Sequence, residues 1–178
     1  SELMVRFQNG DTSAFESLIL RNQQRVLNII YRYLGNSSEA EDVAQEVFIK
    51  LYNFKEKYKP DAKFTTWLFR IVANTCLNSI RDNKKNKTVS IVDDPSNDDT
   101  SVNPIKSFRQ KEMEYIIKDA LDSLSKSQKM AVILNKWEDM SYEDISKAMN
   151  LSVQAVKSLL SRARENLKEK LKDHVIKK

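Results

Sequence analysis

The sequence contains few of the residues that interrupt helices and close tight turns. Its 178 residues include only two glycines and three prolines. Because these residues punctuate turns and strand ends, a fold with many tight turns is not expected. Apolar residues instead recur three and four positions apart over long stretches, which predicts amphipathic helices. The expected fold class is all-α.

Cysteine and histidine each occur once, which limits the possible chemistry. A single cysteine, Cys76, excludes an internal disulfide, and its apolar helical surroundings predict a buried, structural thiol. With His174 as the only histidine, neither a histidine-based dyad nor a histidine metal cluster can be assembled. Gly10 and Gly35 cannot form a phosphate-binding glycine loop. We therefore expect no enzyme activity, no metal and no cofactor.

Long hydrophobic runs are also missing. No stretch of about 18 apolar residues occurs, so no membrane span is expected. The N-terminus lacks a basic segment followed by an apolar stretch, so no signal peptide is expected. Together with the single cysteine, these features predict a cytoplasmic protein.

The charge of the chain is mildly basic and unevenly distributed. Thirty Lys and Arg residues oppose 25 Asp and Glu residues, which gives a formal net charge of +5. From Ser152 to the C-terminus, eight basic residues oppose three acidic ones, and eight minus three is again +5. Cationic charge collected in one segment is typical of nucleic-acid-binding proteins.

Residues 141–171 predict a helix-turn-helix motif. Ser141 and Asp144 are spaced as a capping box before a short helix, and Ser152 can cap a longer helix after a turn. Apolar side chains of the second helix face inward, and its polar side chains are left outside. The outward set consists of Gln154, Lys157, Ser158, Arg162 and Arg164.

These outward side chains suit the DNA major groove, where the second helix of such a motif lies. Arg and Lys donate to guanine, Gln bonds adenine at two points, and further basic side chains neutralise phosphate. The alternative is an ordinary helical hairpin with a solvated charged face, because basic amphipathic helices are common. The motif by itself favours DNA binding over this alternative.

The N-terminal half predicts three helices, enough for one compact domain. Their apolar stripes cover about residues 13–34, 38–54 and 65–82. Ser13 with Glu16, and Ser38 with Glu41, are spaced as capping boxes at the first two helix starts. Gly35 stands where a helix commonly ends.

Two further patterns stand out in this half. Asp42, Gln45 and Glu46 lie at positions i, i+3 and i+4 of the second helix, so they share one exposed face. Residues 53–63 alternate aromatic side chains with lysines and contain Pro60, which predicts a surface loop.

Residues 84–104 separate the two halves. This segment is first basic and then acidic, contains serine and proline, and has no sustained helical period, which predicts a flexible linker. Four aspartates within residues 93–99 are expected to be solvated, and the alternative is that they shield the basic helix from DNA. A second helical domain follows, in which Ser125 and Gln128 are spaced to cap a helix before the helix-turn-helix.

Three blocks of the chain, in order, resemble the extracytoplasmic-function sigma factors of bacterial RNA polymerase. They are AEDVAQEVFIKLYNF, KFTTWLFRIVANTCLNSIR and SYEDISKAMNLSVQAVKSLLSRARENL. The resemblance covers nearly the whole chain. It implies two small all-α domains, σ2 at residues 1–83 and σ4 at residues 105–178, joined by the linker at residues 84–104.

The resemblance also implies a role for each block. The AEDVAQEVF helix of the family docks on the largest polymerase subunit, so core RNA polymerase is the expected partner of Asp42, Gln45 and Glu46. The second block and the loop before it, residues 53–63, would capture the −10 element, with aromatic rings stacking on bases and lysines following the backbone. Its candidates are Phe54, Tyr58, Lys59, Lys63, Phe64, Trp67 and Arg70. Phe64 and Trp67 are equally compatible with a place in the core.

The −35 element would be read by the outward residues of the helix-turn-helix, from Gln154 to Arg164. Ser161 departs from the bulkier residue common in relatives, which leaves the −35 sequence open. The implied partners are core RNA polymerase, promoter DNA and an anti-sigma factor that would cover the same surfaces. No cofactor is implied.

Two other functions are compatible with a helix-turn-helix. One is a polymerase-independent regulator that reads a palindrome as a dimer, and the other is a scaffold with a basic helix. The regulator would leave the polar face of Asp42, Gln45 and Glu46, and the aromatic–lysine loop, without a role.

Overall fold

The computed structural model describes residues 1–60, 63–83 and 104–175. These residues form eight α-helices and a short 3₁₀ helix, and no strand occurs among them, which confirms the all-α prediction. The first half contains α1 (Glu2–Gln8), α2 (Thr12–Leu34), α3 (Ser37–Asn53), η1 (Lys55–Lys57) and α4 (Phe64–Asn83). The second half contains α5 (Pro104–Asp122), α6 (Lys126–Lys136), α7 (Tyr142–Met149) and α8 (Val153–Val175).

The capping boxes predicted for α2 and α3 are wrong. The N-cap of α2 is Asp11, whose carboxylate accepts the Ala14 N–H at 3.2 Å and the Ser13 hydroxyl at 2.6 Å. The N-cap of α3 is Asn36, whose side chain accepts the Glu39 N–H at 3.0 Å. Asp and Asn are as good N-caps as Ser, so each helix begins at the earlier polar residue.

The core of the first half contains the single cysteine. Cys76 lies on α4 with none of its surface exposed, as predicted. Burial, reinforced by the negative charge of Glu46, raises the pKa of this thiol to about 12. The thiol is therefore protonated at neutral pH and acts as a small apolar side chain.

Three helices of the second half begin at the predicted cap residues Ser125, Ser141 and Ser152. The Ser125 hydroxyl accepts the Gln128 N–H, and the Gln128 side chain accepts the Ser125 N–H in return, which completes the predicted capping box of α6. Asn150 closes α7 in the left-handed region at φ 54°. The Ser152 hydroxyl then accepts the Ala155 N–H at 3.1 Å and starts α8.

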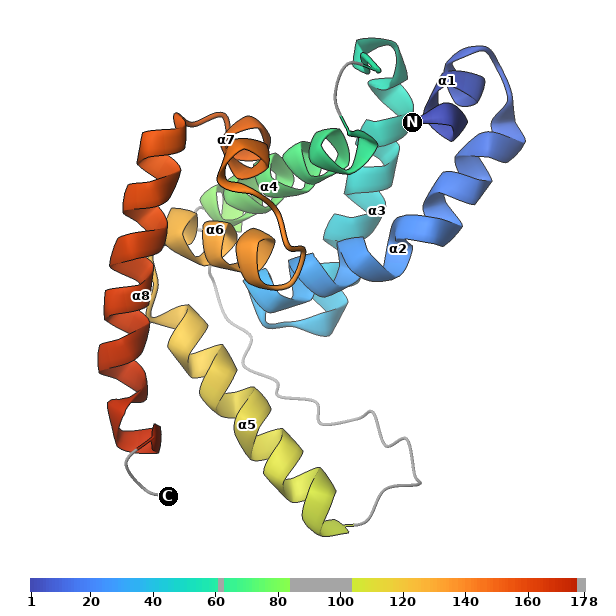
Figure 1. Ribbon diagram of the computed structural model, residues 1–178. Helices are drawn as coiled ribbons and strands as arrows, with labels where there is room; N and C mark the ends of the chain where they lie inside the picture. The colour runs from blue at the N-terminus through green and yellow to red at the C-terminus, as the bar shows by residue number, and fades with distance from the viewer. Residues whose placement is uncertain (61–62, 84–103, 176–178) are drawn as a thin grey trace.

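The two halves pack against each other, which the sequence did not predict. Figure 1 shows α7 lying on α4, and α6 beside α2, while the first turns of α5 project away from the rest. The buried side chains of both halves form one continuous core. The short helix α7 of the helix-turn-helix is therefore held against the start of the helix predicted to handle the −10 element.

Candidate functional site

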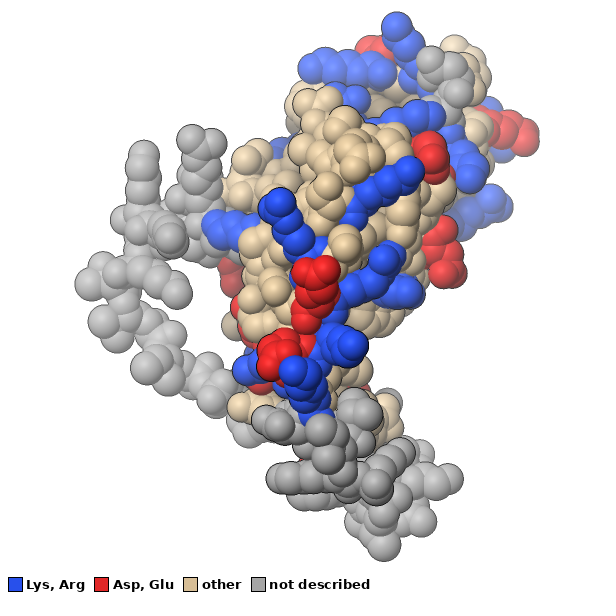
Figure 2. Space-filling view, turned by 60° about the vertical axis from the view of Figure 1, so that its left-hand side comes forward, with Lys and Arg blue, Asp and Glu red and all other residues tan. Residues whose placement is uncertain are grey.

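The outer face of α8 is presented to solvent by a firmly buried inner face. Val156, Leu160 and Ala163 are at most 2% exposed. The predicted outward residues Gln154, Lys157, Ser158, Arg162 and Arg164 are all exposed. Figure 2 views the molecule from the side of α8 and shows that basic side chains are more widespread than acidic ones on this face. This surface has the charge and the side chains that a DNA duplex requires.

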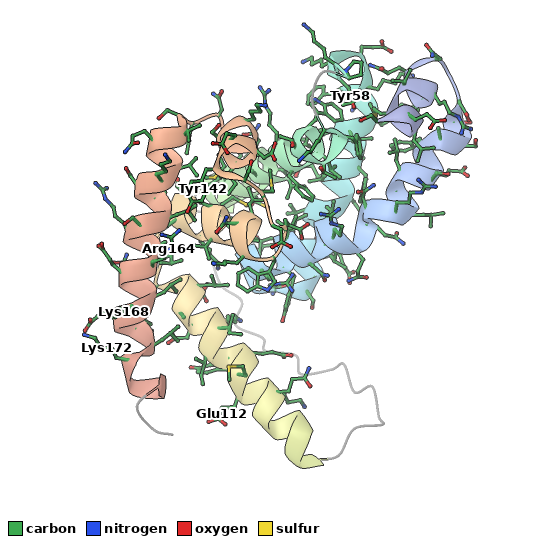
Figure 3. All side chains as sticks on the ribbon, viewed as in Figure 1. Tyr58, Glu112, Tyr142, Arg164, Lys168 and Lys172 are labelled. Carbon is green, nitrogen blue, oxygen red and sulfur yellow. The ribbon has the colours of Figure 1, made fainter. Side chains whose placement is uncertain are left out.

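One of these side chains is anchored to the first helix of the motif. The Arg164 guanidinium donates to the Tyr142 hydroxyl at 2.6 Å, which joins α8 to α7 (Figure 3). The hydrogen bond fixes the direction of the guanidinium. Tyr142 was not among the sequence-predicted site residues, because a contact between positions so far apart is set by the angle between the two helices.

C-terminal to Arg164, the positive charge of α8 is largely neutralised by nearby carboxylates. Lys170 pairs with Asp119 of α5 at 2.9 Å, and the hydrogen bond that its ammonium donates to that carboxylate raises the lysine pKa. Lys172 pairs with Glu169 on the same helix. The residues suited to base contacts are therefore concentrated in the N-terminal half of α8, where a recognition helix enters the groove.

The predicted −10 residues divide into exposed and buried groups. Tyr58 is 3% exposed and Phe64 is 7% exposed, and Trp67 is half-buried. The Tyr58 ring centroid lies 5.3 Å from that of Trp67 and 6.1 Å from that of Phe64. These rings form a packed cluster that anchors the loop, so the predicted surface loop is only partly exposed. In this structure Tyr58 and Phe64 are core residues and do not offer stacking surfaces.

The exposed members of the set are Phe54, Lys59, Lys63 and Arg70. Phe54 is 39% exposed, and the Lys57 ammonium lies 4.4 Å from its ring centroid. Gln8 of α1 holds the adjoining turn by donating to the carbonyls of Lys55 and Tyr58 at 2.7 and 3.0 Å. One exposed ring and several cations can still follow a single strand of DNA.

The polar face of α3 is as exposed as its spacing predicts. Asp42, Gln45 and Glu46 all lie at the surface, and the Glu46 carboxylate pairs with Lys50 at 2.5 Å. Beside this face lies a groove of about 650 Å³ between α2 and α3, lined mainly by apolar side chains. Its lining includes Phe15, Ile19, Leu27, Gln45, Phe48, Ile49 and Tyr52.

Two groove residues were missed by the sequence analysis. Ile49 is 60% exposed and Tyr52 is 47% exposed, and both line the same groove. A signal for Ile49 was present, because it follows Gln45 by four positions and so shares the polar face of the helix. Exposed apolar residues beside a polar face are typical of protein-binding surfaces.

Comparison with known proteins identifies the family. Residues 18–86 match the model for Sigma-70 region 2, and residues 115–167 match the model for Sigma-70, region 4. The RNA polymerase sigma-H factor of Pseudomonas aeruginosa is 33% identical over 186 residues, covering 96% of this chain and 92% of that protein. This chain belongs to the extracytoplasmic-function (ECF) sigma factors. The ECF RNA polymerase sigma-E factor of Haemophilus influenzae is also 33% identical, covering 95% of this sigma factor and 93% of its own length.

Solved structures show the same fold. CnrH, in complex with the cytosolic domain of CnrY, matches this sigma factor with a TM-score of 0.72 at 22% identity, covering 96% of each chain. RpoE of Bartonella quintana, in complex with the anti-sigma factor NepR, matches with a TM-score of 0.68 at 24% identity. The match covers 89% of this chain and 96% of the RpoE chain.

This sigma factor binds core RNA polymerase and directs promoter-specific transcription initiation. Its relatives are sigma factors, which are not enzymes. Within the described residues, no helix has the length and apolar character needed to span a membrane. The same residues contain no group of three or more potential metal ligands.

Proposed function

We propose that three separate surfaces of this sigma factor divide the work of initiation. The outer face of α8 reads the −35 duplex. The loop before α4 and the start of that helix capture the −10 strand, and the α3 face with its groove binds core polymerase. The observation that carries this proposal is the exposure of all five predicted residues of α8 above a buried inner face.

For the −35 element, α8 combines base-reading and phosphate-binding side chains. Lys157 and Arg162 can donate to guanine, and Gln154 can bond adenine at two points. Ser158 adds a hydroxyl, which donates to the Gln154 carbonyl at 3.0 Å and can accept a further hydrogen bond. Arg164, directed by Tyr142, suits a phosphate.

For the −10 element, the exposed cations Lys59, Lys63 and Arg70 follow the strand backbone, and Phe54 offers an exposed ring. Tyr58, Phe64 and Trp67 support this surface from beneath. Separating two DNA strands costs unstacking and unpairing, which the trapped single strand must offset. The buried rings of Tyr58 and Phe64 would contact a base only after the loop before α4 moves.

For core polymerase, the groove between α2 and α3 supplies the apolar contact that the polar face alone lacks. Ile49 and Tyr52 provide exposed apolar area, while Asp42, Gln45 and Glu46 provide acceptors for basic partners. An interface with an apolar centre and a polar rim is the usual arrangement in protein complexes. Holding both DNA-reading domains on one polymerase raises the effective concentration of each at its element.

We assign residues 1–83 to the σ2 domain and residues 105–178 to the σ4 domain, joined by the linker at residues 84–104. Residues 84–103, including the four aspartates at positions 93–99, lie outside the described residues.

By analogy with NepR, described as the anti-sigma factor in the RpoE complex, an anti-sigma factor would cover the DNA-binding and polymerase-binding surfaces. We place the protein in the cytoplasm with its polymerase and expect no catalytic activity of its own.

Replacing Glu46 by alanine tests the polymerase surface. The Glu46→Ala variant is expected to bind core polymerase about fivefold more weakly. This change corresponds to roughly 1 kcal/mol of binding free energy, the size expected when one charge that contributes to an interface is lost. Titration of labelled core polymerase measures this change, and sequencing of transcript starts measures promoter choice, which should not change. Glu2→Ala removes the same charge from exposed α1 and should bind normally. Altered promoter choice with normal polymerase binding would contradict the assignment.

A further inference from the structure

The helix-turn-helix touches the −10 surface through one carboxylate. Asp144 of α7 accepts the Thr66 hydroxyl of α4 at 3.1 Å, and its other oxygen lies 3.6 Å from the Lys63 ammonium. The Ser141 hydroxyl also donates to it at 3.0 Å. Burial raises the pKa of Asp144, but the hydrogen bonds from Ser141 and Thr66 and the charge of Lys63 outweigh it, so the pKa lies below its usual value. The carboxylate is therefore charged at neutral pH.

The rest of the contact between the two halves is specific as well. Arg25 of α2 pairs with Glu138, which follows α6, at 2.8 Å, and the Glu138 side chain is only 6% exposed. Arg32 of α2 lies 5.2 Å from the ring centroid of Trp137, and Lys129 of α6 lies 5.7 Å from that of Tyr33. A carboxylate as buried as that of Glu138 requires an oppositely charged partner. The halves are therefore joined by complementary charges, and not by apolar contact alone.

This closed arrangement is incompatible with reading a whole promoter. The −35 and −10 elements are named by their positions, so their centres lie roughly 25 base pairs apart, which is about 85 Å of duplex at about 3.4 Å per base pair. Val153, the first residue of α8, follows Asp144 by nine positions, and nine residues span at most about 32 Å even when fully extended. Since Asp144 touches Lys63, the start of the recognition helix lies far closer to the −10 surface than the promoter allows. The two halves must separate on polymerase.

We propose that Asp144 is a built-in competitor of promoter DNA. Its carboxylate occupies, on Lys63 and Thr66, the position of a backbone phosphate of the −10 strand, and it keeps the free sigma factor closed until core polymerase separates the halves. A carboxylate and a phosphate oxygen are both anionic acceptors for the same ammonium and hydroxyl donors. The inference rests on the proposed −10 role of Lys63, and it adds Thr66 to that surface.

The Asp144→Asn variant tests the proposal, because it removes the charge and retains the size of the side chain. Glu143→Gln is the matched control, since it removes one negative charge from the neighbouring exposed position of α7. The probe is a short, dye-labelled single-stranded DNA of mixed sequence at low salt. We expect Asp144→Asn to bind it about three- to tenfold more tightly than the wild type, and Glu143→Gln to change the affinity less than twofold. Equal gains in both variants would overturn the proposal.

Closure is measured separately by energy transfer between dyes on two introduced cysteines. Glu16→Cys on α2 and Lys168→Cys on α8 are both exposed, whereas Cys76 is fully buried and will not compete for the dye. Energy transfer should fall in Asp144→Asn and remain at the wild-type level in Glu143→Gln. Thr66→Val removes the hydroxyl of α4 that donates to Asp144. Energy transfer should therefore fall in Thr66→Val, as it does in Asp144→Asn. Unchanged transfer in both Asp144→Asn and Thr66→Val would overturn the proposal.

A double variant separates failure of this inference from failure of the proposed function. Adding Lys63→Ala to Asp144→Asn should cancel most of the gain in DNA affinity. If the halves open but DNA binds no better, Lys63 does not bind the strand, and both the competitor role of Asp144 and the proposed −10 role of Lys63 are overturned. If the halves stay closed while Lys63→Ala still weakens promoter opening by the holoenzyme, the −10 assignment stands and only the competitor role of Asp144 is overturned.

Discussion

Replacing Arg162 by alanine should lower transcription from −35-dependent promoters by about tenfold to a hundredfold. Arg162 is exposed on α8, and its buried neighbour Ala163 fixes its direction away from the core. A bidentate arginine–base contact contributes roughly 1–3 kcal/mol of discrimination, which corresponds to about this change in rate at limiting sigma factor. Single-round transcription with core polymerase measures the effect.

The matched control for Arg162→Ala is Arg21→Ala, which removes an exposed arginine from α2. Arg21→Ala should retain wild-type transcription, and both variants should bind core polymerase normally. The −35 assignment is wrong if Arg162→Ala loses polymerase binding in proportion to transcription, because α8 would then be a polymerase contact. It is also wrong if the two arginine variants are equally active.

Replacing Ile49 by aspartate should weaken binding to core polymerase by about thirtyfold. Ile49 is 60% exposed and lines the groove between α2 and α3, so a charge there would be buried in the complex without a partner. Such burial costs about 2 kcal/mol or more. In the free protein the aspartate remains solvated, so the free energy of unfolding should change by only about 0.5 kcal/mol.

Leu20→Asp is the control for Ile49→Asp. Leu20 is 70% exposed on α2 and is not among the residues that line the groove, so the same kind of change there should leave polymerase affinity unchanged. Titration of labelled core polymerase compares the three proteins, and thermal melting confirms that each is folded. Normal binding by Ile49→Asp would remove the groove from the polymerase surface.

The helix-turn-helix could be predicted from sequence because its signals are local. The cap residues Ser141 and Ser152, the left-handed turn at Asn150 and the alternation of apolar and polar positions all lie within one short segment. Each of these features is determined by neighbouring backbone groups. The inward and outward faces of α8 were therefore assigned correctly from spacing alone.

The aromatic–lysine segment shows where spacing is insufficient. Alternation of rings and lysines describes both a solvated loop and a loop anchored by buried rings. Tyr58 and Phe64 are buried because α4 and η1 bring them together with Trp67, a tertiary arrangement that no local pattern specifies. The contact between Asp144 and Lys63 is likewise set by packing between the halves, and the sequence gives no local sign of it.

The most direct test of the three-surface proposal is transcription in vitro from a genomic pool. Purified sigma factor would be added to sigma-free core polymerase with promoter fragments from its own genome, and the 5′ ends of the transcripts sequenced. We expect specific start sites that share −35 and −10 elements, with Arg162→Ala losing the −35-dependent sites first. The contradicting result is no transcript and no polymerase binding, together with tight binding to a palindromic duplex, as for a polymerase-independent regulator.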